Sequence, residues 1–179
     1  MATGGTQVSY GSQRTPLRLE AADPVGAQAT QLLRQMRAEA LSRYGDILDA
    51  STPVTNELLV ARSAFLLARL KGRSVGCAAL RPLDAEAAEV KRMYVIPAVR
   101  RRGIARLLLA ELEAQAAAFG FTTLRAETGN RQPEAIGLYK SSGFRRIGPY
   151  GDHAEDPLSI CFEKEVVGVH HAQSGANIP

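Results

Sequence analysis

Arg100-Arg101-Arg102-Gly103-Ile104-Ala105 is a short basic run that stands immediately before an amphipathic stretch. The first turn of a helix there would have backbone N–H groups without partners and roughly half a positive charge. Gly103 would let the backbone approach a ligand closely. The pattern is typical of an anion site, for which a pyrophosphate is a natural occupant. A solvated basic loop is the alternative, but the glycine and the helix behind it favour phosphate binding.

Two other phosphate loops do not fit this segment. No Gly-Lys-Ser or Gly-Lys-Thr follows it, which excludes a Walker-type loop. A dinucleotide fingerprint needs more glycines than the segment has. A second segment with candidate chemistry runs from Tyr150 to Ser159, which is polar and acidic and holds a histidine.

The elements that must position these residues follow from periodicity and from turn residues. Helices are predicted from Asp23-Pro24 to about Tyr44, over Arg101–Phe119 and over Pro133–Ser141. Strands are predicted over Leu17–Ala21, Ala64–Leu70, Ser74–Leu80, Ala88–Ile96, Thr122–Thr128, Phe144–Ile147 and Ser159–Val166. This order predicts an α/β fold, with a mixed sheet and helices on both faces.

Length and composition point to one intracellular domain. The chain has 179 residues, of which 45% are hydrophobic, and its formal net charge is +4. We predict a disordered arm over 1–15, a domain over 16–167 and a flexible tail over 168–179. We expect a cytoplasmic protein without a membrane span or a secretory signal. Cys77 and Cys161 are expected to stay reduced, and the three histidines lack zinc-ligand spacing.

Two motifs resemble those of the GCN5-related N-acetyltransferase (GNAT) superfamily. The run Arg100 to Ala105 resembles its acyl-CoA pyrophosphate motif, which stands between a strand and a long helix. The segment Ala135 to Phe144 resembles its second motif, with a Leu-Tyr pair followed by Gly-Phe. The resemblance covers about Ser63 to Glu165. It implies a single-domain GNAT fold with a mixed, mostly antiparallel sheet.

The resemblance implies direct acetyl transfer from acetyl-CoA, a co-substrate, to an acceptor that is usually a primary amine. It implies no metal. The residues expected to contact CoA are Met93 and Val95 through their backbone, Arg100, Arg101, Arg102, Gly103, Ile104, Ala105 and Arg106 at the phosphates, and Asn130 or Gln132. Relatives often have an asparagine before the second-motif helix, whereas the aligned residue here is Gln132.

Two residues are candidates for proton transfer. Glu89 lies on the strand that leads into the basic run, where some relatives have an acidic residue that accepts the amine proton. Its alternative role is an ion pair with Lys91 or an arginine on the sheet surface. Tyr139 matches a family tyrosine that approaches the CoA sulfur and can protonate the leaving thiolate. Its alternative role is that of a core aromatic residue.

The family architecture places the loop before the last strand near the acceptor. Tyr150, Asp152, His153 and Asp156 are therefore candidate substrate-binding residues, and a solvated loop is the alternative. The end of this loop, together with Phe162-Glu163-Lys164, resembles a bacterial small-molecule branch of the superfamily.

Several functions remain open from the sequence. We expect a small-molecule N-acetyltransferase. The alternatives are a protein or peptide N-acetyltransferase and a CoA-binding regulator without turnover. A nucleic-acid-binding module is disfavoured by the modest charge and by the acidic Asp152–Asp156 segment. The expected partners are acetyl-CoA and a small amine, without nucleic acid or membrane. A homodimer is left open by the resemblance.

Overall fold

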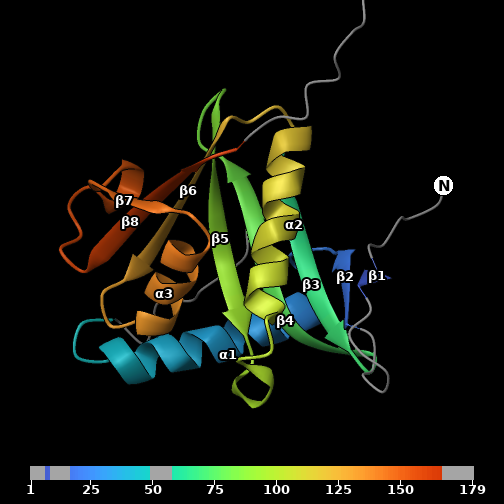
Figure 1. The fold of residues 1–179 in the computed structure, drawn as a ribbon. Helices are drawn as coiled ribbons and strands as arrows, with labels where there is room; N and C mark the ends of the chain where they lie inside the picture. Colours follow the sequence, from blue (N-terminus) through green and yellow to red (C-terminus); the bar gives the residue numbers. More distant parts are fainter. Residues whose placement is uncertain (1–6, 9–16, 49–57, 167–179) are drawn as a thin grey trace, which may run out of the picture.

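A computed structural model describes residues 7–8, 17–48 and 58–166 of the chain. It contains an eight-stranded sheet in the order β1-β2-β3-β4-β5-β6-β8-β7 (Figure 1). The strands are β1 Gln7–Val8, β2 Leu17–Ala21, β3 Ala64–Leu70, β4 Arg73–Pro82, β5 Ala87–Val95, β6 Thr123–Gly129, β7 Arg145–Ile147 and β8 Ser159–Glu165. The α-helices are α1 Ala27–Tyr44, α2 Ile104–Ala118 and α3 Pro133–Ser141, and short 3₁₀ turns occupy Pro97–Val99 and Gly151–His153.

The two faces of the sheet pack against different helices, because successive side chains of a strand point to opposite faces. In β3, Leu66 and Ala68 join the cluster that contains the leucines of α2. Phe65 and Leu67 join a second cluster with Ala29 and Leu32 of α1. The predicted α/β class is confirmed: the sheet is mixed and mostly antiparallel, and it has helices on both faces (Figure 1).

The parallel pair β5 and β6 contains the structural feature that forms the site. Their pairing runs from Ala87 opposite Thr123 to Val90 opposite Ala126 and then stops. The pairing of β5 with β4 is irregular just beyond this point, and Arg92 there adopts a positive φ of 56°. A bulge of this kind bends a strand. Beyond Val90 the two strands therefore diverge, and α3 lies beside the gap (Figure 1).

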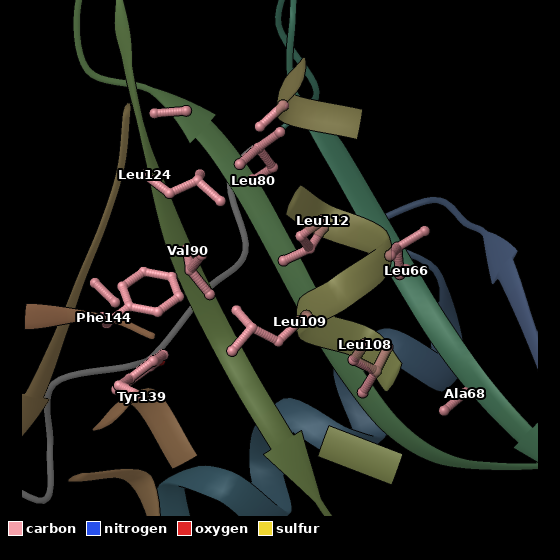
Figure 2. Packing of buried hydrophobic residues seen from close by; sticks show 14 of the residues in the cluster. Leu66, Ala68, Leu80, Val90, Leu108, Leu109, Leu112, Leu124, Tyr139 and Phe144 are labelled. Carbon is pink, nitrogen blue, oxygen red and sulfur yellow. The ribbon is translucent and has the colours of Figure 1, made fainter. Parts of the chain in front are cut away.

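Helix α2 covers one sheet face and fixes the position of the basic run. Its buried residues are Ile104, Leu108, Leu109, Leu112 and Ala116, and Figure 2 shows the three leucines. The helix begins at Ile104, three residues later than predicted, because Arg101 and Gly103 have positive φ values of 62° and 82°. At the other end, Phe119, the last residue of the predicted helix, is the C-cap and is 37% exposed.

The first helix also begins later than the sequence suggests. Asp23 accepts the backbone N–H groups of Val25 and Gly26 in a tight turn, and α1 starts at Ala27. Its predicted end at Tyr44 is confirmed. Within the predicted N-terminal arm, Gln7–Val8 pairs with β2 as the short strand β1. The rest of that arm, the predicted tail and residues 49–57 lie outside the described residues.

Candidate active site

A cavity of about 860 Å³ lies where β5 and β6 diverge. Its walls come from the start of α2, from β5 and β6, from α3 and from one face of α1. Twelve of the predicted site residues line it: Glu89, Met93, Val95, Arg100, Arg101, Gly103, Ile104, Ala105, Arg106, Gln132, Tyr139 and His153. The predicted residues outside its lining are Arg102, Asn130, Tyr150, Asp152 and Asp156.

One wall, which we call the donor wall, is the first turn of α2 with its preceding loop. Gly103 is the N-cap in a left-handed conformation, and no side chain caps the helix. The N–H groups of Ile104, Ala105 and Arg106 therefore lack the partners that a capped helix start would have. A Cβ added at Gly103 would meet no heavy atom within 4 Å. Open space and uncapped N–H groups together make this turn suited to an anion.

Arg100 has a structural task that the sequence did not reveal. Its Nε donates to the carbonyl oxygen of Val95 at 2.7 Å, and its guanidinium pairs with Glu39 of α1. Glu39 also pairs with Arg43 at 2.8 Å, and Arg43 pairs with Glu134 of α3 at 2.9 Å. The hydrogen bond from Arg100 holds the pKa of Glu39 below its usual value. Arg100 therefore fixes the loop rather than presenting an uncompensated charge.

These four residues, Arg100, Glu39, Arg43 and Glu134, form an ion-pair bridge from the α2 loop across α1 to α3. All four line the cavity. The two remaining arginines of the predicted run, Arg101 and Arg102, are both exposed. Arg101 lines the cavity, whereas Arg102 lies outside its lining. Sequence reasoning missed Glu39 and Arg43, although their spacing of four places both on one helix face.

The opposite wall, which we call the acceptor wall, is organised around Glu89. This carboxylate is buried, and its residue is 5% exposed. Its Oε1 accepts a hydrogen bond from the Tyr150 hydroxyl at 2.9 Å and lies 3.1 Å from Nε2 of His153. Its Oε2 lies 3.2 Å from Nζ of Lys91. Glu89 therefore forms the ion pair with Lys91 that was predicted as its alternative role, and it also lines the cavity.

The Gly151–His153 turn brings distant residues to Glu89. Tyr150 also stacks against Arg125 of β6, with the guanidinium 5.4 Å from the ring centroid. Burial and the charge of Glu89 raise the pKa of the Tyr150 hydroxyl, so it stays protonated and donates. Asp156 accepts the N–H of Leu158 and the hydroxyl of Ser159 at the start of β8. This is a loop-shaping role outside the cavity.

Glu127 of β6 is a second carboxylate in the cavity, and sequence reasoning missed it. The hydroxyl of Ser159 donates to it at 2.7 Å. It makes no ion pair within the described part of the chain. Position 127 alternates with Ala126 and Thr128, whose side chains are buried on the other face of the strand. The alternation in the sequence predicts which face of β6 is buried, but it does not identify Glu127 as a cavity residue.

Tyr139 on α3 belongs both to the core and to the cavity. Its ring is 2% exposed and lies 5.5 Å from the rings of Phe144 and of Phe162 (Figure 2). Within the described residues its hydroxyl has no hydrogen-bond partner, and the residue lines the cavity. Burial raises the pKa of this hydroxyl, and the charge of Glu127 adds to the effect. The phenol is therefore a proton donor over the whole neutral range.

Gln132 and Asn130 precede α3 and were both candidates for contact with the donor. Gln132 is the N-cap residue of α3, makes no side-chain cap and lines the cavity. Asn130 donates its backbone N–H to Leu158 and lies outside the lining. Among the described residues, no cluster of His, Cys, Asp or Glu could hold a metal ion. The helices described here are too short or too polar to cross a membrane.

A sequence profile of the acetyltransferase (GNAT) family matches residues 29–144. The chain belongs to this family. An IAA acetyltransferase of Azospirillum brasilense is 42% identical to it over 135 residues, which cover 70% of this chain and 86% of that protein. The uncharacterized N-acetyltransferase YjgM of Escherichia coli is 31% identical over 128 residues, with coverage of 65% and 74%. The protein is therefore a GNAT acetyltransferase.

Solved GNAT structures share the fold. A Klebsiella pneumoniae protein assigned as an acyl-CoA N-acyltransferase superposes with a TM-score of 0.69 at 31% identity, over 83% of this chain and 97% of that one. A GNAT acetyltransferase of Elizabethkingia anophelis with acetyl-CoA bound has a TM-score of 0.60 at 20% identity, over 83% and 97%. The predicted GNAT fold is confirmed.

Proposed function

We propose that this GNAT acetyltransferase moves an acetyl group from acetyl-CoA to a primary amine of a small molecule. One observation carries the proposal: a single cavity joins an uncapped helix start at Gly103 with a buried, hydrogen-bonded carboxylate at Glu89. The first feature suits a pyrophosphate, and the second suits proton transfer. The divergence of β5 from β6 connects them.

The donor wall supplies backbone contacts for CoA. The N–H groups from Gly103 to Arg106 would hold the pyrophosphate, and Arg101 would add charge. Beyond Val90 one edge of β5 has no partner strand among the described residues, so the backbone near Met93 and Val95 could pair with the pantetheine arm. Gln132 lies close enough to the same cavity to contact the donor.

The reaction requires a neutral amine and a stable leaving group. An amine with a pKa of ~10.4 is mostly protonated at pH 7, which costs roughly 4–5 kcal/mol. The site around Glu89 would take the amine proton as the C–N bond forms and the C–S bond breaks. The departing thiolate would take a proton from Tyr139, whose hydroxyl burial keeps protonated.

A small acceptor is supported by how the acceptor wall is covered. Tyr150 and His153 both contact Glu89, so the Gly151–His153 turn folds over this end of the cavity. A folded protein surface would have to displace that turn before its lysine reached Glu89. The A. brasilense relative is named an IAA acetyltransferase.

The proposal is tested by measuring free thiol released from acetyl-CoA across amino acids, polyamines, aminoglycosides and peptides. We expect release that depends on one class of small amine, together with a product heavier by one acetyl group in mass spectrometry. If no acceptor raises thiol release above the background rate, the proposed function is contradicted. Turnover with peptides alone would contradict the small-molecule part.

A further inference from the structure

We propose that His153 is the group that accepts the amine proton, and that Glu89 is the carboxylate that positions His153. This inference rests on the proposed function, since it assigns a step of the same reaction. It reverses the roles that the sequence suggested, in which Glu89 was the base and His153 a substrate contact.

Glu89 already has three polar partners. Oε1 receives the Tyr150 hydroxyl and faces Nε2 of His153, while Oε2 faces the ammonium of Lys91. Its side chain is 6% exposed. An incoming amine would have to reach the remaining acceptor position of this nearly covered carboxylate, which lies on Oε2 beside the ammonium of Lys91. The positive charge of Lys91 disfavours the approach of a second cationic group.

His153 is better placed to meet an acceptor. Its side chain is 22% exposed, against 6% for Glu89, and it lines the cavity. Because an ionised carboxylate only accepts hydrogen bonds, the ring nitrogen 3.1 Å from Oε1 of Glu89 must be the donor. The neutral ring then carries its hydrogen on Nε2 and its lone pair on Nδ1. No residue in the described ranges bonds to Nδ1.

The direct partner of the ring is the Glu89 carboxylate. An imidazolium at this position would face the Glu89 carboxylate directly, in the way a buried carboxylate orients and stabilises the histidine of a catalytic triad. The charged and titratable groups around this cluster are Lys91 on β5, Arg125 and Glu127 on β6, Tyr150 on the same loop and Cys161 on β8. Lys91 approaches Oε2, so Oε1 remains available to the ring.

The proton balance is simple. The amine nitrogen attacks the thioester carbon, and its proton passes to Nδ1 of His153 directly or through one water. The C–S bond then breaks, and the thiolate takes the proton of Tyr139. No oxidant, reductant or metal enters the step. The positive charge that forms on His153 is matched by Glu89.

The decisive variants are His153→Gln and Glu89→Gln, assayed with the most active amine of the acceptor panel. Glutamine at 153 can still donate an N–H to Glu89 but has no basic nitrogen. We expect kcat to fall about 10²-fold, acetyl-CoA affinity to stay unchanged, and the rise of rate with pH to disappear. Glu89→Gln should lower kcat but keep a rise of rate with pH, because the ring of His153 is still present and only its positioning partner has changed.

The opposite pattern would overturn the inference. If His153→Gln keeps the wild-type rate and pH profile while Glu89→Gln abolishes both, Glu89 is the base. The ring itself can be read by ¹⁵N NMR of the wild-type protein, where we expect the hydrogen of the neutral ring on Nε2. A hydrogen on Nδ1 instead would also overturn it. Wild-type protein without turnover on any amine would refute the proposed function and this step with it.

Discussion

The donor wall and the acceptor wall are built from different parts of the chain. The donor wall offers backbone N–H groups at the start of α2, and it is built from a few consecutive residues around Gly103. The acceptor wall offers side chains, and it joins Glu89 with Tyr150 and His153, which lie 61 and 64 positions further along the chain. A backbone site tolerates changes of side chain that leave its turn intact, whereas a side-chain network does not.

The ion-pair bridge ties the donor wall to the rest of the cavity. Arg100 binds Val95 on β5 and Glu39 on α1, and Arg43 continues the contact to α3. Because of these contacts, a displacement of α1 would also displace the loop that precedes α2. These charges connect the donor wall with α1 and α3.

The largest effect should come from breaking the donor wall. Gly103→Glu places a negative charge and bulk where the pyrophosphate would lie, and we expect acetyl-CoA affinity in calorimetry to fall on the order of 100-fold or more. Gly72→Glu is the matched control, since Gly72 has a φ of 74° and equally open space but lies on the β3–β4 turn outside the cavity lining. If the two variants bind acetyl-CoA with equal affinity, Gly103 is not part of the acetyl-CoA site.

Tyr139→Phe should lower turnover by about 10²-fold and leave acetyl-CoA affinity nearly unchanged. The phenylalanine keeps the packing against Phe144 and Phe162, so only the proton donor is lost. Single-turnover rates measured where chemistry limits the reaction provide the check. A variant as fast as wild type would show that the hydroxyl serves no step and that Tyr139 is a core residue only.

Glu39→Gln should lower the free energy of unfolding at pH 7 by about 1–2 kcal/mol, because it removes the charge that holds Arg100 and Arg43. The folded-state pKa of Glu39 is lowered, so its contribution is present above the ordinary glutamate value and is lost as pH falls through the lowered one. Urea unfolding should show that the difference in unfolding free energy between wild type and Glu39→Gln is smaller near pH 3 than at pH 7.

Asp46→Asn is the comparison for the bridge. Asp46 also pairs with an arginine, Arg131, but both side chains are largely exposed at 58% and 44%. We expect a smaller loss than for Glu39→Gln. Equal losses in the two variants, or a gap for Glu39→Gln that persists at low pH, would contradict a stabilising role for the bridge.

Arg101→Ala should have the smallest effect on the donor wall. Arg101 lines the cavity and Arg102 does not. We therefore expect Arg101→Ala to lose acetyl-CoA affinity about fivefold, or ~1 kcal/mol, and Arg102→Ala to change it little. The difference should shrink at high salt, since exposed charges are screened. Equal losses in the two variants would mean that the run acts only through its overall charge.

The same contrast explains what the sequence could predict. The donor wall was predictable because a glycine between a strand and an amphipathic helix is a local pattern, and the start of α2 differs from the prediction by only three residues. The pairing of Glu89 with Lys91 was also foreseen, since both lie on one strand. The contacts of Glu89 with Tyr150 and His153 depend on sheet order and on one turn of a loop. Periodicity carries no information on either.

Arg100 shows a second limit. Three consecutive arginines look equivalent in the sequence, yet one is bound to Val95 and Glu39, one lines the cavity, and one lies outside its lining. Arg101 in the middle of the run has a positive φ of 62°, and Arg100 pairs with Glu39 of α1. Neither the backbone turn nor a contact with α1 can be read from the sequence pattern of the run.

A crystal structure of the protein with CoA would test the division of the cavity most directly. We expect the pyrophosphate within hydrogen-bond distance of the N–H groups from Gly103 to Arg106, and the sulfur beside the Tyr139 hydroxyl on the side of the cavity that faces Glu89. A pyrophosphate bound away from the start of α2, or a sulfur remote from both Tyr139 and Glu89, would contradict the assignment of the two walls.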